Sequence, residues 1–108
     1  MQAGHAAEEG IRPARTVWAY TIQIVPPQTR SRLRPVRALL DQEHAAGTNG
    51  DRSWAGRLIV GAKATRILIV SDSLEHSADV NRKLEVELSL LEATITVSEP
   101  VQVPGVAA

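Results

Sequence analysis

The segment RILIVSDS, residues 66–73, carries the most information about the fold of this chain. Its four consecutive aliphatic residues, Ile67 to Val70, are apolar on both faces of an extended backbone, which is typical of a central strand. The Ser-Asp-Ser sequence that follows supplies residues that commonly cap a helix. We therefore expect a central strand over residues 66–71, with a helix starting at Ser73 or Ser77.

This helix is predicted to run to Leu91. One apolar stripe, the face expected to pack against a sheet, consists of Val80, Leu84, Leu88 and Leu91. Val86 and Leu90 lie nearly opposite this stripe. A second apolar patch is unusual on a helix that covers one face of a small sheet, so Val86 and Leu90 are candidate interface residues.

The segments before residue 66 predict two more strands and another helix. Residues 17–25 place Trp18, Tyr20 and the isoleucines on one face, as in a strand with a core side, and two prolines then end it. A helix is expected from near Arg34 to about residue 46, since Pro35 is tolerated only in the first turn. A second strand is expected over residues 54–62, with Gly56 marking a bulge or bend.

The complete order is strand, helix, strand, strand, helix, strand, the last strand being Thr94–Val97. Right-handed crossovers then place both helices on one face of a four-stranded antiparallel sheet. The predicted fold class is therefore α+β, a ferredoxin-like βαββαβ two-layer sandwich. In that topology the first and third strands are central and the second and fourth are edges.

Length and composition are those of one globular domain. The chain has 108 residues, 44% hydrophobic and 22% charged, with twelve basic and twelve acidic side chains. We expect a mobile N-terminal tail over residues 1–15, one domain over 16–99 and an irregular tail over 100–108. The apolar runs are too short to cross a membrane, the N-terminus does not resemble a secretory signal, and a cytoplasmic location is expected.

One partial resemblance concerns residues 66–72 and the helix and strand that follow. This run resembles the opening strand and helix of a response-regulator receiver domain, in which acidic residues follow such a strand. The resemblance covers a short part of the chain, and Asp72 is the single acid at that position. We therefore interpret it as a coincidence of strand-helix-strand patterning.

The third strand predicts a surface for self-association. A sheet with helices on one face leaves its other face open, and either Ile67 and Ile69 or Leu68 and Val70 must point there. We name Ile67 and Ile69, together with Val86 and Leu90, as the candidate interface residues. The expected partner is a second copy of the chain, with a homodimer packed sheet against sheet or through the helix patch.

A basic cluster is the second candidate site. Arg30, Arg32, Arg34 and Arg37 lie around a helix start with no acid among them. Arginine side chains and free amide groups at such a position bind phosphate or carboxylate, which makes these residues anion-binding candidates. Nucleic acid remains an unlikely partner, because the third strand lacks the aromatic residues that stack on bases.

Other chemistry is not indicated by the sequence. The chain has no cysteine, and its histidines are not at metal-ligand spacing. His76 near Asp72 and Glu75 resembles a cation site, but serine and acidic residues at a helix start are ordinary capping residues. We name no catalytic residue, no cofactor and no metal ligand.

The leading hypothesis is a non-enzymatic domain that self-associates and binds a small ligand or a protein partner. One alternative is binding of nucleic acid or another anion through residues 30–37. Another is a cofactor-independent enzyme with its pocket between helices and sheet, which requires a cavity holding a polar group of perturbed pKa.

Overall fold

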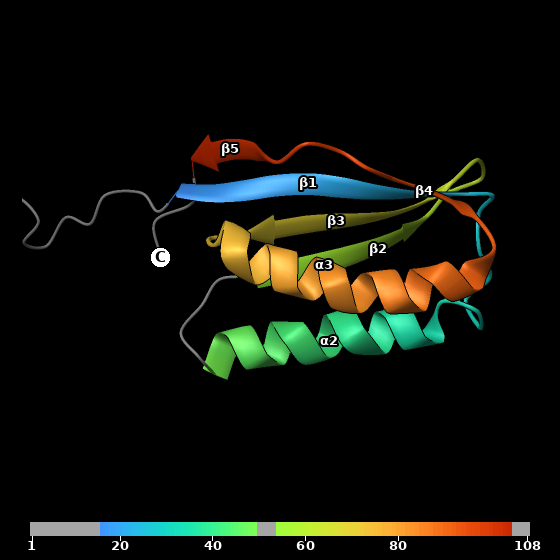
Figure 1. The fold of residues 1–108 in the computed structure, drawn as a ribbon, viewed down its shortest axis with the longest axis horizontal. Coiled ribbons are helices and arrows are strands. Elements are labelled where there is room, and N and C mark those ends of the chain that lie inside the picture. The colour runs from blue at the N-terminus through green and yellow to red at the C-terminus, as the bar shows by residue number, and fades with distance from the viewer. Residues whose placement is uncertain (1–15, 50–53, 105–108) are drawn as a thin grey trace, which may run out of the picture.

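The computed structural model describes residues 16–49 and 54–104, so the tail predicted over residues 1–15 lies outside the described part. Within these described residues, two helices and five strands follow one another (Figure 1). In order they are β1 (Thr16–Val25), α2 (Arg34–Asn49), β2 (Trp54–Val60), β3 (Thr65–Ser71), α3 (Leu74–Leu88) with a 3₁₀ turn (Ser89–Leu91), β4 (Thr94–Val97) and β5 (Val101–Pro104).

The strands form one antiparallel sheet of order β2-β3-β1-β4, in which β5 also pairs with β1. Both helices pack on the same side of this sheet (Figure 1). The predicted α+β class, with one antiparallel sheet and two helices, is confirmed. The first and third strands, β1 and β3, are the two central strands of this order, as their apolar sequences predict. Neither helix of the described part is long and apolar enough to cross a membrane.

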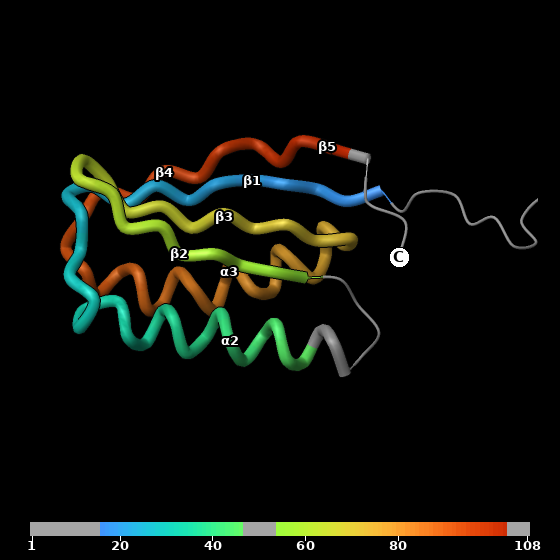
Figure 2. The backbone as a smooth tube through the Cα atoms, turned by 180° about the vertical axis from the view of Figure 1, so that it is seen from behind, coloured from blue at the N-terminus to red at the C-terminus, as the bar shows by residue number. Residues whose placement is uncertain are grey.

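The predicted number of strands, four, is wrong. Residues after Pro100, expected to be irregular, form β5, and β4 and β5 run one after the other along the same edge of β1 (Figure 2). Ile22 pairs with Val97 and Ala19 with Val101, so three steps along β1 match four along the edge. One extra residue is therefore accommodated between β4 and β5, as in a β-bulge. Prolines are tolerated on such an edge, since its outer side needs no partner.

The core lies between the sheet and the helices. Alternate residues of β1, namely Tyr20, Ile22 and Ile24, point into it, and so do Ile67 and Ile69 of β3. The stripe predicted for α3 is confirmed in full, because Val80, Leu84, Leu88 and Leu91 are all buried.

The prediction of which β3 side chains point away from the helices is wrong. Ile67 and Ile69 were expected at an interface, but both are 0% exposed beneath the helices. Successive strand residues alternate between faces, so Leu68 and Val70 point to the opposite side. Leu68 is 37% exposed. The sequence left the two pairs equivalent, and packing against α2 and α3 distinguishes them.

Gly56 does not form the expected bulge or bend. The pairing of β2 with β3 is continuous from Trp54 to Val60, so no residue is inserted. A Cβ atom at residue 56 would lie 2.8 Å from Cδ2 of Leu40, closer than side chains pack. The glycine is therefore required because α2 approaches the sheet backbone closely at this position.

Candidate functional site

The sheet face away from the helices carries a row of apolar side chains. Val101, Ala19, Val70 and Ala55 are paired across four neighbouring strands, so their side chains share that face. Leu68 lies beside this row on β3. We call this surface the open sheet face. Val101 is 59% exposed, which shows that part of the row is accessible to solvent in the described structure.

A groove runs along the other layer, between α3 and β4. It consists of two adjoining hollows of about 360 and about 320 Å³, which share Asn81 and Val97 among their lining residues. Ile95 and Leu88 line one hollow, and Tyr20 lines the other. We call this feature the α3–β4 groove. Its volume is in the range of small-ligand sites, and its walls are mostly apolar.

Tyr20 and Asn81 provide polar groups inside the groove. The hydroxyl of Tyr20 donates a hydrogen bond to Oδ1 of Asn81 at 2.5 Å, which leaves the amide N–H groups of Asn81 for other acceptors. Burial raises the pKa of Tyr20 above its ordinary value of 10.0. Tyr20 is therefore protonated near neutral pH, where its hydroxyl donates to Asn81.

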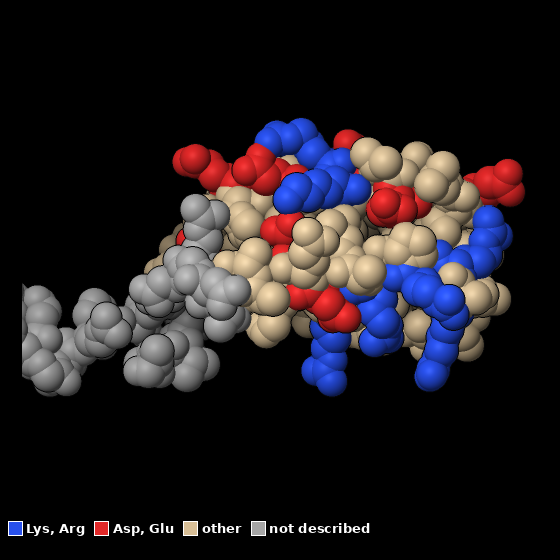
Figure 3. Space-filling model, turned by 90° about the horizontal axis from the view of Figure 1, so that it is seen from below, with Lys and Arg blue, Asp and Glu red and all other residues tan. Residues whose placement is uncertain are grey.

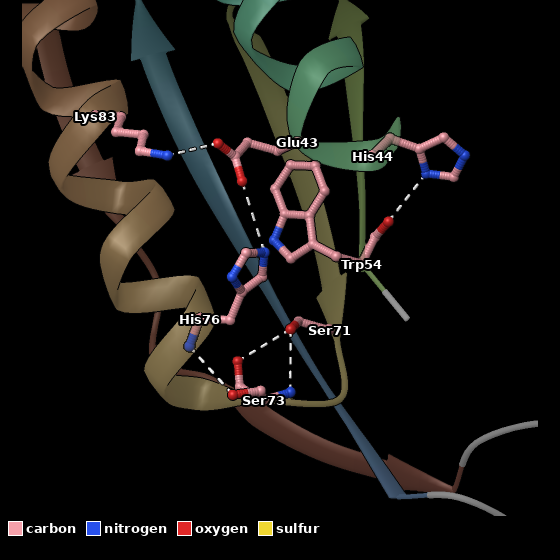
Figure 4. Close-up of polar contacts among 7 residues, drawn as sticks. All are labelled: Glu43, His44, Trp54, Ser71, Ser73, His76 and Lys83. Carbon is pink, nitrogen blue, oxygen red and sulfur yellow. Dashed lines mark hydrogen bonds and ion pairs between the residues drawn. The ribbon is translucent and has the colours of Figure 1, made fainter. Parts of the chain in front are cut away.

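A charged cluster lies on the opposite flank of α3, where this helix faces α2 (Figure 4). The Glu43 side chain is only 5% exposed, and its Oε2 accepts a hydrogen bond from Nζ of Lys83 at 2.7 Å. His76 Nε2 lies 3.7 Å from Oε1 of the same carboxylate. The ring of Trp54 packs edge-on against His76 at a centroid distance of 6.3 Å. His44 Nδ1 lies 3.0 Å from the carbonyl oxygen of Trp54.

Sequence reasoning did not identify this cluster. The available signal was Glu43 itself, which continues the stripe of Val36 and Leu40 at helical spacing, so that an acid occupies a core position. An ionised carboxylate that is nearly buried requires cationic or hydrogen-bonding partners, and Lys83 supplies one. We interpret the cluster as a connection between α2 and α3, because Glu43 on α2 contacts both Lys83 and His76 on α3.

The four arginines of the basic cluster are all exposed. Arg30 and Arg32 lie in the turn before α2, and Arg34 and Arg37 lie in its first turn. Basic side chains gather at the end of the molecule where Figure 1 places the start of α2 (Figure 3). The structure brings these residues to one end of the helical layer, and their role in binding anions stays a prediction.

The start of α3 is capped as expected at the first of the two predicted positions. Oγ of Ser73 accepts a hydrogen bond from the backbone N–H of His76 at 3.1 Å. The His76 ring lies toward Glu43 (Figure 4), and Glu75 is exposed.

In the described residues, no group of three or more histidine and acidic side chains is arranged to hold a metal ion.

Val86 and Leu90 are on the surface, 63% and 69% exposed. They form the second candidate surface for self-association, away from the open sheet face.

Comparison with models of known protein families, with curated proteins and with solved structures finds no match to this chain.

Proposed function

We propose that this chain is a non-enzymatic binding domain that forms a homodimer by packing the open sheet faces of two copies together. The observation that carries the proposal is the in-register row of Val101, Ala19, Val70 and Ala55, which no described helix covers. Stacked sheets place their inner faces about 10 Å apart, so such rows exclude water from one another.

The charges on this face support one arrangement. Arg57 lies opposite Leu68 on the neighbouring strand, and Arg66 lies two residues before it. In such a dimer the two-fold axis would lie between the two sheets, perpendicular to the strands and along the apolar row. The rows of the two copies would then face each other, and the two Arg66 side chains would lie on opposite sides of the axis. The partner copy would thus meet an apolar centre with cations at the margin.

The proposal includes the ferredoxin-like assignment. The order β2-β3-β1-β4, with both helices on one side, supports a βαββαβ sandwich to which β5 has been added. In this topology the sheet face opposite the helices is available for a partner.

The test is the molar mass of the full chain in solution, by light scattering over a range of concentrations. We expect a dimer for the unmodified chain and a monomer for Ala19→Glu, because Ala19 lies inside the apolar row between Val101 and Val70, where the added charge would be buried between the sheets without a cation opposite it. The matched control is Val86→Glu on the exposed side of α3, which should leave the dimer intact. Circular dichroism verifies that both variants are folded.

Two outcomes would contradict the proposal. A monomer at every concentration would show that the open sheet face does not bind a second copy. Loss of the dimer in Val86→Glu but not in Ala19→Glu would place the interface on the α3 patch instead.

A further inference from the structure

The α3–β4 groove borders an edge of the described sheet. Among the described strands, β4 pairs with β1 alone and ends the strand order of the sheet, so its other edge faces no described strand. The backbone N–H of Ser98 donates to the carbonyl of Thr21 at 2.9 Å, which sets the alternation of the ladder. Thr94 and Thr96 therefore point their backbone groups at β1, whereas Ile95 and Val97 point theirs away from it.

The same two residues line the groove with their side chains. Ile95 pairs with Ile24 and Val97 with Ile22, so the side chains of both lie on the helix side of the sheet. A strand added beside β4 would pair with the outward backbone groups of Ile95 and Val97. Its alternate side chains would then enter the groove between β4 and α3.

The charges around the groove specify the partner. Among the described residues that line the two hollows, Glu85 of α3 is the only charged one. Glu92 and Glu99 are exposed just beyond the two ends of β4. A segment with lysine or arginine side chains would complement these carboxylates, whereas an acidic segment would be repelled.

We propose that the α3–β4 groove binds an extended, basic peptide segment of another protein, which adds to β4 as a further strand. Apolar side chains at alternate positions would contact Ile95 and Leu88, and the Asn81 amide would donate to a peptide carbonyl. This proposal rests on the proposed role as a binding domain and names the class of partner, but it does not require the homodimer.

The test is a titration of the ¹⁵N-labelled full chain, followed by NMR, with a synthetic peptide of about eight residues in which lysine and valine alternate. We expect saturable shifts of the backbone amides of Ile95 and Val97 and of the Asn81 side-chain amide. A peptide of the same sequence with alternate backbone nitrogens methylated should bind at least about tenfold more weakly, because it cannot pair with β4.

Charge reversal provides the matched pair of variants. Glu85→Lys should weaken binding of the lysine peptide and strengthen binding of the equivalent glutamate peptide. Glu75→Lys makes the same change at an exposed position of α3 outside the groove, and it should leave the two affinities nearly unchanged. Equal effects of the two variants would show that only overall charge matters and would overturn the proposal.

Three further results would also overturn it. These are an absence of shifts at Ile95 and Val97 at millimolar peptide, equal binding of the methylated peptide, and shifts at those residues that follow protein concentration without peptide. The last would mean that a second copy occupies the edge. Repeating the titration with Ala19→Glu separates the two proposals, since a monomeric variant that still binds the peptide supports both.

Discussion

The hydroxyl of Tyr20 and Oδ1 of Asn81 lie 2.5 Å apart, and this hydrogen bond joins β1 to α3 inside the α3–β4 groove. The two residues are 61 positions apart in the sequence, so the bond forms only when the helix has packed on the sheet. It fixes the hydroxyl of the one tyrosine in the chain as a donor toward the helix.

We expect this tyrosine to titrate above its ordinary pKa of 10.0, because burial disfavours the phenolate. The folded state then holds the proton more tightly than the unfolded state. The resulting stability is complete below pH 10.0 and is lost as the pH rises through the folded pKa. A pH titration followed by tyrosinate absorbance measures the midpoint of Tyr20 ionisation. The urea-unfolded chain gives the unfolded midpoint for comparison, and Tyr20→Phe gives the background absorbance. A folded midpoint at or below the unfolded one would contradict the prediction.

Truncation of the α3 core stripe should destabilise the domain strongly. Leu84 is 0% exposed, and we expect Leu84→Ala to lower the free energy of unfolding by about 2 to 5 kcal/mol through lost burial and a residual cavity. Val86→Ala, on the exposed side of the same helix, should cost less than about 0.5 kcal/mol in the monomer. Urea denaturation at low protein concentration compares the two. Equal losses would mean that the buried face of α3 is assigned wrongly.

Gly56→Ala should also be destabilising. The added methyl group would lie 2.8 Å from Cδ2 of Leu40 and 2.8 Å from the Trp54 ring, and such overpacking costs about 1 to 3 kcal/mol. Combining it with Leu40→Val should cost less than the sum of the single changes, because the smaller side chain gives room. Strict additivity in thermal or urea unfolding would show that Leu40 does not limit the space at residue 56.

The ion pair between α2 and α3 should behave as a unit. Lys83→Met removes a partner of the nearly buried Glu43 carboxylate and should destabilise the domain by about 1 to 3 kcal/mol, less than for a fully buried pair because Lys83 is half exposed. Adding Glu43→Leu should restore most of the loss, since leucine extends the apolar stripe of α2. The full double-mutant cycle measures the coupling, and a double variant less stable than Lys83→Met alone would contradict this account.

The sequence predicted the elements whose periodicity is local and strong. The buried stripe of α3, the Ser73 cap and the central position of β3 all follow from patterns within one segment. β5 was missed because prolines flank a short run of alternating valines, and only the pairing with β1 makes it a strand. Gly56 was assigned a bulge because its true cause, the approach of Leu40, lies on a different element.

The candidate site was less accessible to sequence reasoning. The apolar surplus on β3 was recognised, but the pair that points away from the helices is Leu68 and Val70, of which Leu68 is exposed and Val70 is half-buried, and this choice depends on which face the helices cover. The groove was not predicted at all. It is formed by α3 and β4 together, and the polar groups of Tyr20 and Asn81 meet only in the folded chain.

The pairing of Thr16 with Pro104 places the first and last strands of the sheet side by side at one end. The turn from Gly61 to Ala64 connects β2 to β3 at the opposite end of the sheet. In this turn the backbone N–H of Gly61 donates a hydrogen bond of 3.0 Å to the carbonyl of Ala64. A short linker from residue 104 to residue 16 would therefore close the backbone into a ring, and new termini could be opened between Ala62 and Lys63. Such a circular permutant would keep every strand pairing of the sheet while reversing which elements a ribosome synthesises first.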